Sequence, residues 1–143
     1  MALAVELKDL QSVVKLLSMG AHVDVRDWEI DRTPLLTAIH NAWTDGVDVL
    51  LNAKADPLAT DANGFTALHA CTVDYDHGHD FSIFKRLIKA GVNVDAANLQ
   101  GFSALTYLGQ KKACVEVIKH LLDAGADPRG ALSSKRQCLC IRR

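Results

Sequence analysis

The sequence predicts an all-α fold built from repeated helical units, and three observations predict it. A pair of large aliphatic residues recurs at intervals of 34, 37 and 34 residues, at Leu16-Leu17, Leu50-Leu51, Leu87-Ile88 and Leu121-Leu122. A second signal keeps step with three of these pairs, at Thr33-Pro34-Leu35, Thr66-Ala67-Leu68-His69 and Ser103-Ala104-Leu105. Aromatic residues make up only 6% of the chain, so the core is expected to consist of Leu, Val, Ile and Ala, which suits helices.

Each full unit is predicted to contain two short helices, as the unit that begins at Thr66 illustrates. The hydroxyl of Thr66 suits the start of a helix, where it can accept from a backbone N–H. A second helix is expected over residues 81–90, whose apolar side chains share one face at helical spacing. Gly91 ends this helix because glycine tolerates the positive φ found past a helix C-terminus. The turn sequences 61–64 and 98–101 separate neighbouring units.

The period of about 33 residues, the T-P-L-H-like start, the paired leucines and the G-A-D-P or G-V-N-V close resemble the ankyrin repeat, from about Ala4 to about Pro128. The resemblance implies a solenoid of stacked helix-turn-helix units with projecting hairpin loops. Stacking is required because helices of this length are marginal alone, so neighbouring units must share a core. We expect an ankyrin-repeat domain over 1–130, with a partial unit 1–27, full units at about 28–60, 61–97 and 98–130, and a basic C-terminal tail at 131–143.

Four departures from the family pattern stand out. Lys54 replaces the turn glycine, so the turn there is either strained or not left-handed. Leu36 and Thr106 replace the signature histidine, which is kept at His69. The unit that begins at Thr66 contains about four extra residues between its helices, around positions 75–78.

Composition and charge exclude several classes of protein. Sixteen Lys and Arg residues stand against seventeen Asp and Glu residues, which argues against nucleic acid as the main partner. No apolar run approaches the roughly 18 residues that would cross a bilayer, so no membrane partner is expected. The four cysteines form neither a CxxC pair nor a disulfide-dense pattern, which favours reduced thiols. We expect a monomer in the cytoplasm, with the nucleus as the alternative.

The side chains that could in principle act in catalysis are better explained by a structural role. Thr66 and His69 are near neighbours on the first turn of a helix, and the resemblance implies that they have a hydrogen-bonding role that ties adjacent turns together. No nucleophile or orienting carboxylate accompanies His69, and Cys71 is two residues on, where a helix turns it away. No phosphate-binding glycine loop, nucleophile elbow or metalloprotease motif occurs. We therefore predict no enzyme activity, no catalytic residue and no cofactor.

Two further clusters carry weaker alternatives. Metal-ligand side chains gather in the insertion, at Asp74, Asp76, His77, His79 and Asp80. An ordinary solvated loop is the favoured interpretation, and zinc binding is the alternative. In the tail, reversible acylation of Cys138 and Cys140 beside basic residues is a second alternative.

The predicted partner-binding residues are those that the solenoid does not need for its core. They fall at hairpin tips or at the exposed ends of the first helices, and in similar proteins such positions line the concave face: Trp28, Glu29, Arg32, His40, Asn41, Asn63, Phe65, Val73, Asp74, Leu99, Gln100, Phe102, Gln110 and Lys111. Trp28, Phe65 and Phe102 are expected to align in one exposed row. The alternative, that Phe65 and Phe102 pack on a neighbouring loop, has nearly equal weight.

The most favoured function is non-catalytic binding of another protein through the concave face and the hairpin tips. Acidic residues in the first hairpin and the insertion suggest a partner with basic and apolar character. Two alternatives remain: the substrate-positioning part of a larger enzyme or ubiquitin-ligase adaptor, and a small metal-dependent hydrolase that uses the His/Asp insertion.

Overall fold

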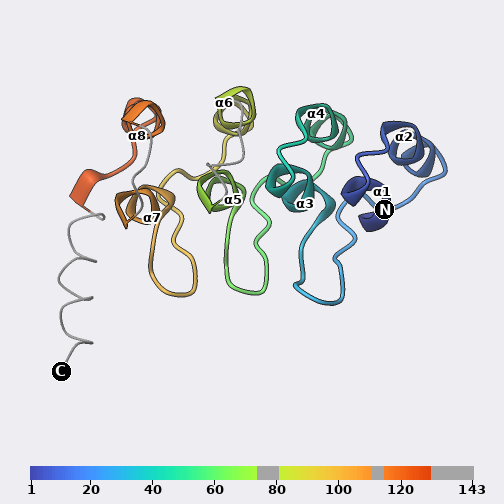
Figure 1. Cartoon of the computed structure of the whole chain (residues 1–143), viewed down its shortest axis with the longest axis horizontal. Coiled ribbons are helices and arrows are strands. Elements are labelled where there is room, and N and C mark those ends of the chain that lie inside the picture. Colours follow the sequence, from blue (N-terminus) through green and yellow to red (C-terminus); the bar gives the residue numbers. More distant parts are fainter. Residues whose placement is uncertain (74–80, 111–114, 130–143) are drawn as a thin grey trace.

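A computed structural model describes residues 1–73, 81–110 and 115–129, which form eight helices in four antiparallel pairs (Figure 1). The pairs are α1 (Ala2–Glu6) with α2 (Leu10–Ser18), α3 (Pro34–His40) with α4 (Thr44–Asn52), α5 (Ala67–Val73) with α6 (Phe81–Lys89), and α7 (Ala104–Gln110) with α8 (Val115–Asp123). The described residues contain no strand, only an isolated bridge between Ala97 and Ser103. The prediction of an all-α repeat fold is confirmed.

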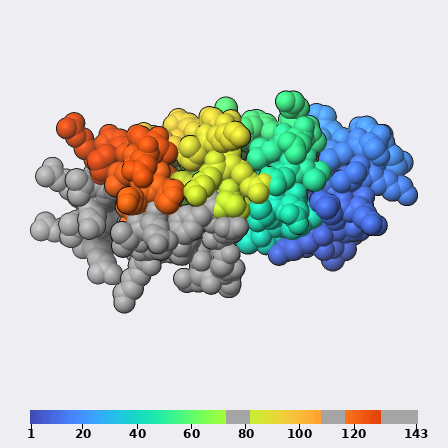
Figure 2. All heavy atoms as spheres, turned by 90° about the horizontal axis from the view of Figure 1, so that it is seen from above, coloured from blue at the N-terminus to red at the C-terminus, as the bar shows by residue number. Residues whose placement is uncertain are grey.

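The helices form two layers, with hairpin loops projecting from one of them (Figure 1). The inner layer contains α1, α3, α5 and α7, each in contact with the next, and the outer layer contains α2, α4, α6 and α8. Seen from above, the units follow one another as successive bands along the long axis (Figure 2). Within the described part of the chain, no helix is both long and apolar enough to cross a membrane.

Local sequence sets where the helices begin. The carboxylate of Asp9 accepts from the backbone N–H of Ser12 at 3.2 Å, which caps α2 and, with the Ser12 hydroxyl bond, lowers the pKa of Asp9. The hydroxyl of Thr33 accepts from the backbone N–H of Leu36 at 3.4 Å, and Pro34 occupies the first position of α3. The cap residues therefore mark helix starts that the repeat pattern already indicated.

The core consists of aliphatic side chains at equivalent positions of successive units. Leu35 and Leu68 are buried in the inner layer, and Leu50, Leu87 and Leu121 in the outer layer are each 0% exposed. These last three are the first members of the recurring aliphatic pairs, so the pattern reflects burial against neighbouring units. The first unit differs, since Leu16 is only half-buried and Val13 is 0% exposed there.

Lys54 adopts the left-handed conformation expected of the glycine that it replaces. Its φ is 68°, close to the values of 83° at Gly20 and 82° at Gly91. Of the two interpretations left open by the sequence, the strained left-handed turn is therefore correct. The end of the helix imposes this backbone conformation, and it is strained at Lys54 because the residue has a Cβ atom.

Two glycines at the same position of consecutive hairpin turns give a matched test of how closely neighbouring hairpins pack. Gly64 and Gly101 have φ values of 73° and 79°, but only at Gly64 would a Cβ meet backbone, 2.8 Å from the amide nitrogen of Leu99. Gly101→Ala is expected to cost about 1 kcal/mol through backbone strain alone. Gly64→Ala should cost about 1 kcal/mol more, because the Leu99 amide must move. Urea unfolding of both variants measures the difference, and equal losses would contradict the contact.

Candidate functional site

Each of the three hairpin tips contains a hydrogen-bonded turn of the same kind. These turns show which residues of one hairpin are equivalent to which residues of the next. The turn is closed by backbone bonds from Asp27 to Arg32, from Asp61 to Phe65 and from Asn98 to Phe102. In each turn the side-chain oxygen of the first residue also accepts from two backbone N–H groups of the loop. Asp and Asn suit this position because their short side chains reach their own loop backbone.

This correspondence corrects the expected row of aromatic residues. The first turn contains one residue more than the other two, so Arg32, and not Trp28, is equivalent to Phe65 and Phe102. Trp28 is 90% exposed at the tip, whereas Phe65 and Phe102 are half-buried at the base of their hairpins. The expectation of one exposed row is therefore wrong, since the three side chains occupy two different environments.

Phe65 packs on the helices rather than extending from the tip. Its ring lies edge-on to His69 of its own unit and to Tyr107 of α7, with centroid distances of 5.4 and 5.6 Å. Phe65 is therefore a packed side chain, but it packs on helix residues of its own and the next unit and not on a neighbouring loop, as the alternative expected.

Backbone and ion-pair contacts hold the hairpins against one another. The N–H of Ala62 donates to the carbonyl of Ile30 at 3.2 Å, and the N–H of Leu99 donates to the carbonyl of Asn63 at 3.1 Å. Arg26 bridges the first two hairpins, because its guanidinium donates to the Thr60 carbonyl at 2.8 Å and to the Asp31 carboxylate at 2.7 Å. The tips thus form one continuous edge rather than separate loops.

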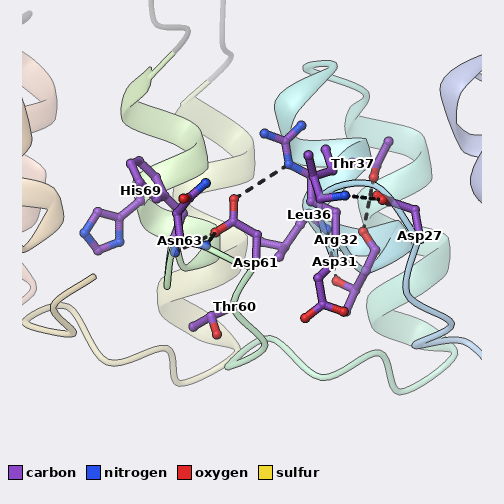
Figure 3. Close-up of polar contacts among 12 residues, drawn as sticks. Asp27, Asp31, Arg32, Leu36, Thr37, Thr60, Asp61, Asn63 and His69 are labelled. Carbon is purple, nitrogen blue, oxygen red and sulfur yellow. Dashed lines mark hydrogen bonds and ion pairs between the residues drawn. The ribbon is translucent and has the colours of Figure 1, made fainter. Parts of the chain in front are cut away.

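We call the surface formed by the hairpin edge and the inner helices the inner face. A hollow of about 150 Å³ lies on the inner face, where the edge meets the helices. Three consecutive units line the hollow: Arg32, Leu36, His40, Asp61, Asn63, Phe65, Ala70 and Tyr107. Figure 3 shows the polar wall of this site, where Arg32 and Asp61 point toward one another between α3 and the second hairpin. Leu36, Phe65, Ala70 and the Tyr107 ring provide its apolar lining.

The polar wall is built around a nearly buried carboxylate. The Asp61 side chain is 7% exposed, and its second oxygen lies 3.9 Å from Nε of Arg32. In the next unit Asn98 replaces the aspartate, and the residue that corresponds to Arg32 is Phe65. Burying a carboxylate without a nearby cation would cost free energy. The neutral amide of Asn98 therefore suits a position whose neighbour is the neutral side chain of Phe65. The Asn98 Nδ2 atom is buried and has no hydrogen-bond partner within the described residues.

His69 connects the third unit to the fourth. Its Nε2–H donates to the Phe102 carbonyl at 2.7 Å, and its Nδ1 accepts from the Thr66 hydroxyl at 2.8 Å. The Thr66 N–H also points at Nδ1, at 3.4 Å, so this nitrogen carries no proton. Burial lowers the pKa of His69, which keeps the ring neutral. The expected hydrogen-bonding role of Thr66 and His69 is confirmed, since His69 bonds to Thr66 and to the Phe102 carbonyl of the next hairpin.

The remaining side chains with catalytic or metal-ligand chemistry are Cys71 and the His, Asp and Glu residues of the described part of the chain. The Cys71 thiol is buried, and burial raises its pKa to about 12, so it is a poor nucleophile. Within the described ranges, no three His, Cys, Asp or Glu side chains are grouped to hold a metal ion. The cluster from Asp74 to Asp80 and the tail cysteines lie outside these ranges.

The structure brings four of the predicted binding residues into the hollow: Arg32, His40, Asn63 and Phe65. Trp28, Glu29, Leu99 and Gln100 are exposed at the tips instead, Asn41 directly follows α3, and Phe102 lies at the base of the third hairpin. Val73 and Gln110 are the last residues of α5 and α7. Asp74 and Lys111 lie outside the described residues.

Four residues of the hollow were missed by sequence reasoning: Leu36, Asp61, Ala70 and Tyr107. One signal could have identified Tyr107. In the three full units the corresponding position holds Thr37, Ala70 and Tyr107. Its residue type therefore changes, while the leucine two residues before it is the same in all three units. A position that is free to vary between otherwise similar units is not fixed by the shared core.

Comparisons with known proteins agree with this architecture. A family model of ankyrin repeats in three copies matches residues 1–79, and a model of the single ankyrin repeat matches residues 63–99. The B-cell lymphoma 3 protein homolog of Mus musculus is 28% identical over 129 residues, which cover 87% of this chain and 28% of that protein. The palmitoyltransferase AKR1 of Lachancea kluyveri is 28% identical over an alignment of 165 positions, which covers 91% of this chain and 22% of the relative.

A second palmitoyltransferase AKR1, from Kluyveromyces lactis, is 42% identical over 60 residues, covering 42% of this chain and 8% of that protein. The chain thus spans less than a third of the length of these curated relatives. Because the three-copy model covers more than half of the sequence and the helices stack as repeated pairs, the chain belongs to the ankyrin repeat family.

Proposed function

We propose that this chain is a non-catalytic recognition module, which binds a partner protein through its inner face and hairpin tips. Ankyrin repeats generally mediate protein–protein interaction. The observation that carries the proposal for this chain is the hollow, because it combines an apolar lining with a polar wall on the inner face.

The size of the hollow matches one side chain of a partner. A cavity of about 150 Å³ accommodates a molecule the size of benzene, and the hollow has about that volume. Interfaces gain much of their affinity from a few aromatic or aliphatic anchors buried in such pockets. Arg32 and Asn63 would then hydrogen-bond the backbone that flanks the anchor, which provides orientation.

Filling the hollow tests this proposal. Ala70 lines the hollow and is half-buried on α5, so Ala70→Leu places extra carbon atoms where the anchor would sit. We expect partner affinity to fall about tenfold or more, equivalent to about 1.4 kcal/mol. Captured proteins from a cell extract, quantified for each variant and confirmed with the purified pair, measure the loss.

Ala53→Leu is the matched control, because Ala53 is also half-buried but follows α4 in the outer layer. Both variants should melt at nearly the temperature of the unchanged protein. If every captured partner bound equally to both variants, the inner face would not be the recognition surface.

A second candidate function is suggested by the likeness to palmitoyltransferase AKR1 over 91% of this chain. We infer as the alternative that the solenoid positions protein substrates for a larger enzyme. In that case, captured partners should be enriched in proteins with thioester-linked acyl groups, detected by hydroxylamine cleavage. Partners without such groups would exclude this alternative and leave simple recognition.

A further inference from the structure

The hairpin edge that borders the hollow carries an excess of negative charge. The three hairpins, residues 20–33, 53–66 and 90–103, contain seven acidic and three basic side chains, a net charge of −4. The whole chain has a net charge of only −1. The negative charge is therefore concentrated on the edge from which the proposed binding surface is built.

The basic residues nearest the hollow are already paired. Arg26 donates to Asp31, and Arg32 lies beside Asp61. The carboxylates of Asp27 and Glu29 add to the negative field at the first tip, and Glu29 is exposed. A partner that approaches this tip therefore meets a surface that attracts cations.

Trp28 adds a second feature that favours a cation. Its side chain is 90% exposed between Asp27 and Glu29, so its ring is available to a partner. The face of an indole ring attracts Arg and Lys side chains, and neighbouring carboxylates strengthen this preference. An exposed tryptophan that contributes nothing to the core is accounted for by such a contact.

We infer that the occupant of the inner face is a basic protein segment. The segment places one aromatic or branched aliphatic side chain in the hollow and an Arg or Lys against Trp28 and Glu29. Inside the hollow itself the lining favours an apolar side chain, because Leu36, Phe65 and Ala70 line it and Arg32 already lies beside Asp61. The apolar anchor and the basic residue thus occupy different places, and this arrangement rests on the recognition function proposed above.

Selection from a random peptide library displayed on phage, with the unchanged protein as bait, tests this inference. Peptides that bind the unchanged protein but no longer bind the Ala70→Leu variant should combine an aromatic or branched residue with Arg or Lys. Synthetic copies of these peptides serve as the probe for fluorescence anisotropy. Their affinity should fall several-fold as salt is raised, because exposed charges are screened.

Charge reversal at the first tip provides the matched comparison. Glu29→Lys should weaken the selected peptides by about 5- to 10-fold, on the scale of exposed ion pairs and rim charges. Asp123→Lys makes a comparable charge change on an exposed residue of α8, in the outer layer, and should change affinity less than about twofold. Trp28→Ala should weaken the same peptides by about 2- to 5-fold.

The outcomes separate the inference from the proposed function. Peptides that require the hollow but are acidic or uncharged, or that respond equally to Glu29→Lys and Asp123→Lys, would overturn the basic segment and leave recognition through the hollow intact. If no selected peptide distinguishes Ala70→Leu from Ala53→Leu, the hollow is not the binding site and both proposals fail.

Discussion

Replacing Leu87 with alanine is expected to lower the free energy of unfolding by about 2–5 kcal/mol. Leu87 is 0% exposed on α6, which packs on both α5 and α4, so the truncation leaves a void shared by two units. The loss combines the transfer free energy of the removed atoms with the cost of a cavity that the stacked helices cannot close. Urea unfolding followed by circular dichroism measures it.

Leu99→Ala is the control, because Leu99 is 78% exposed at the third hairpin tip and the residue change is identical. Its effect should stay within about 0.5 kcal/mol, as for ordinary surface positions. Similar losses for the two variants would mean that stability does not come from the interface between units. Leu50→Ala should behave like Leu87→Ala, since Leu50 is the corresponding residue of the preceding unit.

The second large effect is expected for His69→Ala, at about 2–4 kcal/mol. The substitution removes a fully buried ring together with its hydrogen bonds to the Phe102 carbonyl and the Thr66 hydroxyl. The Phe102 carbonyl keeps its bond from the Asn98 N–H, so the loss combines two hydrogen bonds of about 0.5–1.5 kcal/mol each with the cost of the cavity. His22→Ala is the control, since His22 is exposed and accepts one local bond from Asp24.

His69 also predicts a specific dependence of stability on pH. The pKa of His69 is lowered in the folded chain below its ordinary value of 6.5, because burial disfavours the charged ring. Well above pH 6.5 the ring is neutral in both states and contributes no pH dependence. As the pH falls below 6.5 the unfolded chain binds a proton first, so stability decreases until the folded-state pKa is passed.

His69→Asn removes this titration while keeping a polar side chain, so the unfolding free energy of that variant should fall less between pH 6.5 and lower pH. Titration of the remaining groups is common to both proteins and cancels in the comparison. An unchanged slope in the variant would show that His69 is not buried as a neutral ring.

Much of the fold could be predicted from the sequence, because the information for it is local or repeats between neighbours. Thr33 and Thr66 mark helix starts through capping, and the aliphatic pairs mark the face of each outer helix that meets the next unit. Even the turn at Lys54 follows the period, since the helix ending imposes its positive φ whatever the residue.

The candidate site depended on contacts that periodicity does not carry. Trp28 was expected to correspond to Phe65, although Thr33 and Thr66 align Arg32 with Phe65, as the hydrogen bonds of the turns show. Which way Phe65 points depends on Tyr107, a residue of the next unit at a position that is alanine in its own. No count along the chain reveals such a pairing.

By itself, therefore, the sequence determined the repeat family, the order of the helices, most residues of the shared core and the acidic character of the first hairpin. Only the tertiary structure decided that Arg32, Phe65 and Tyr107, from three different units, enclose one hollow, while Trp28 stays exposed beside it. The physical reason is that a core position is fixed by a preference that each unit repeats. The hollow, in contrast, arises where side chains of unequal size from successive units meet, and their relative placement is set by the turns and hydrogen bonds that join the hairpins.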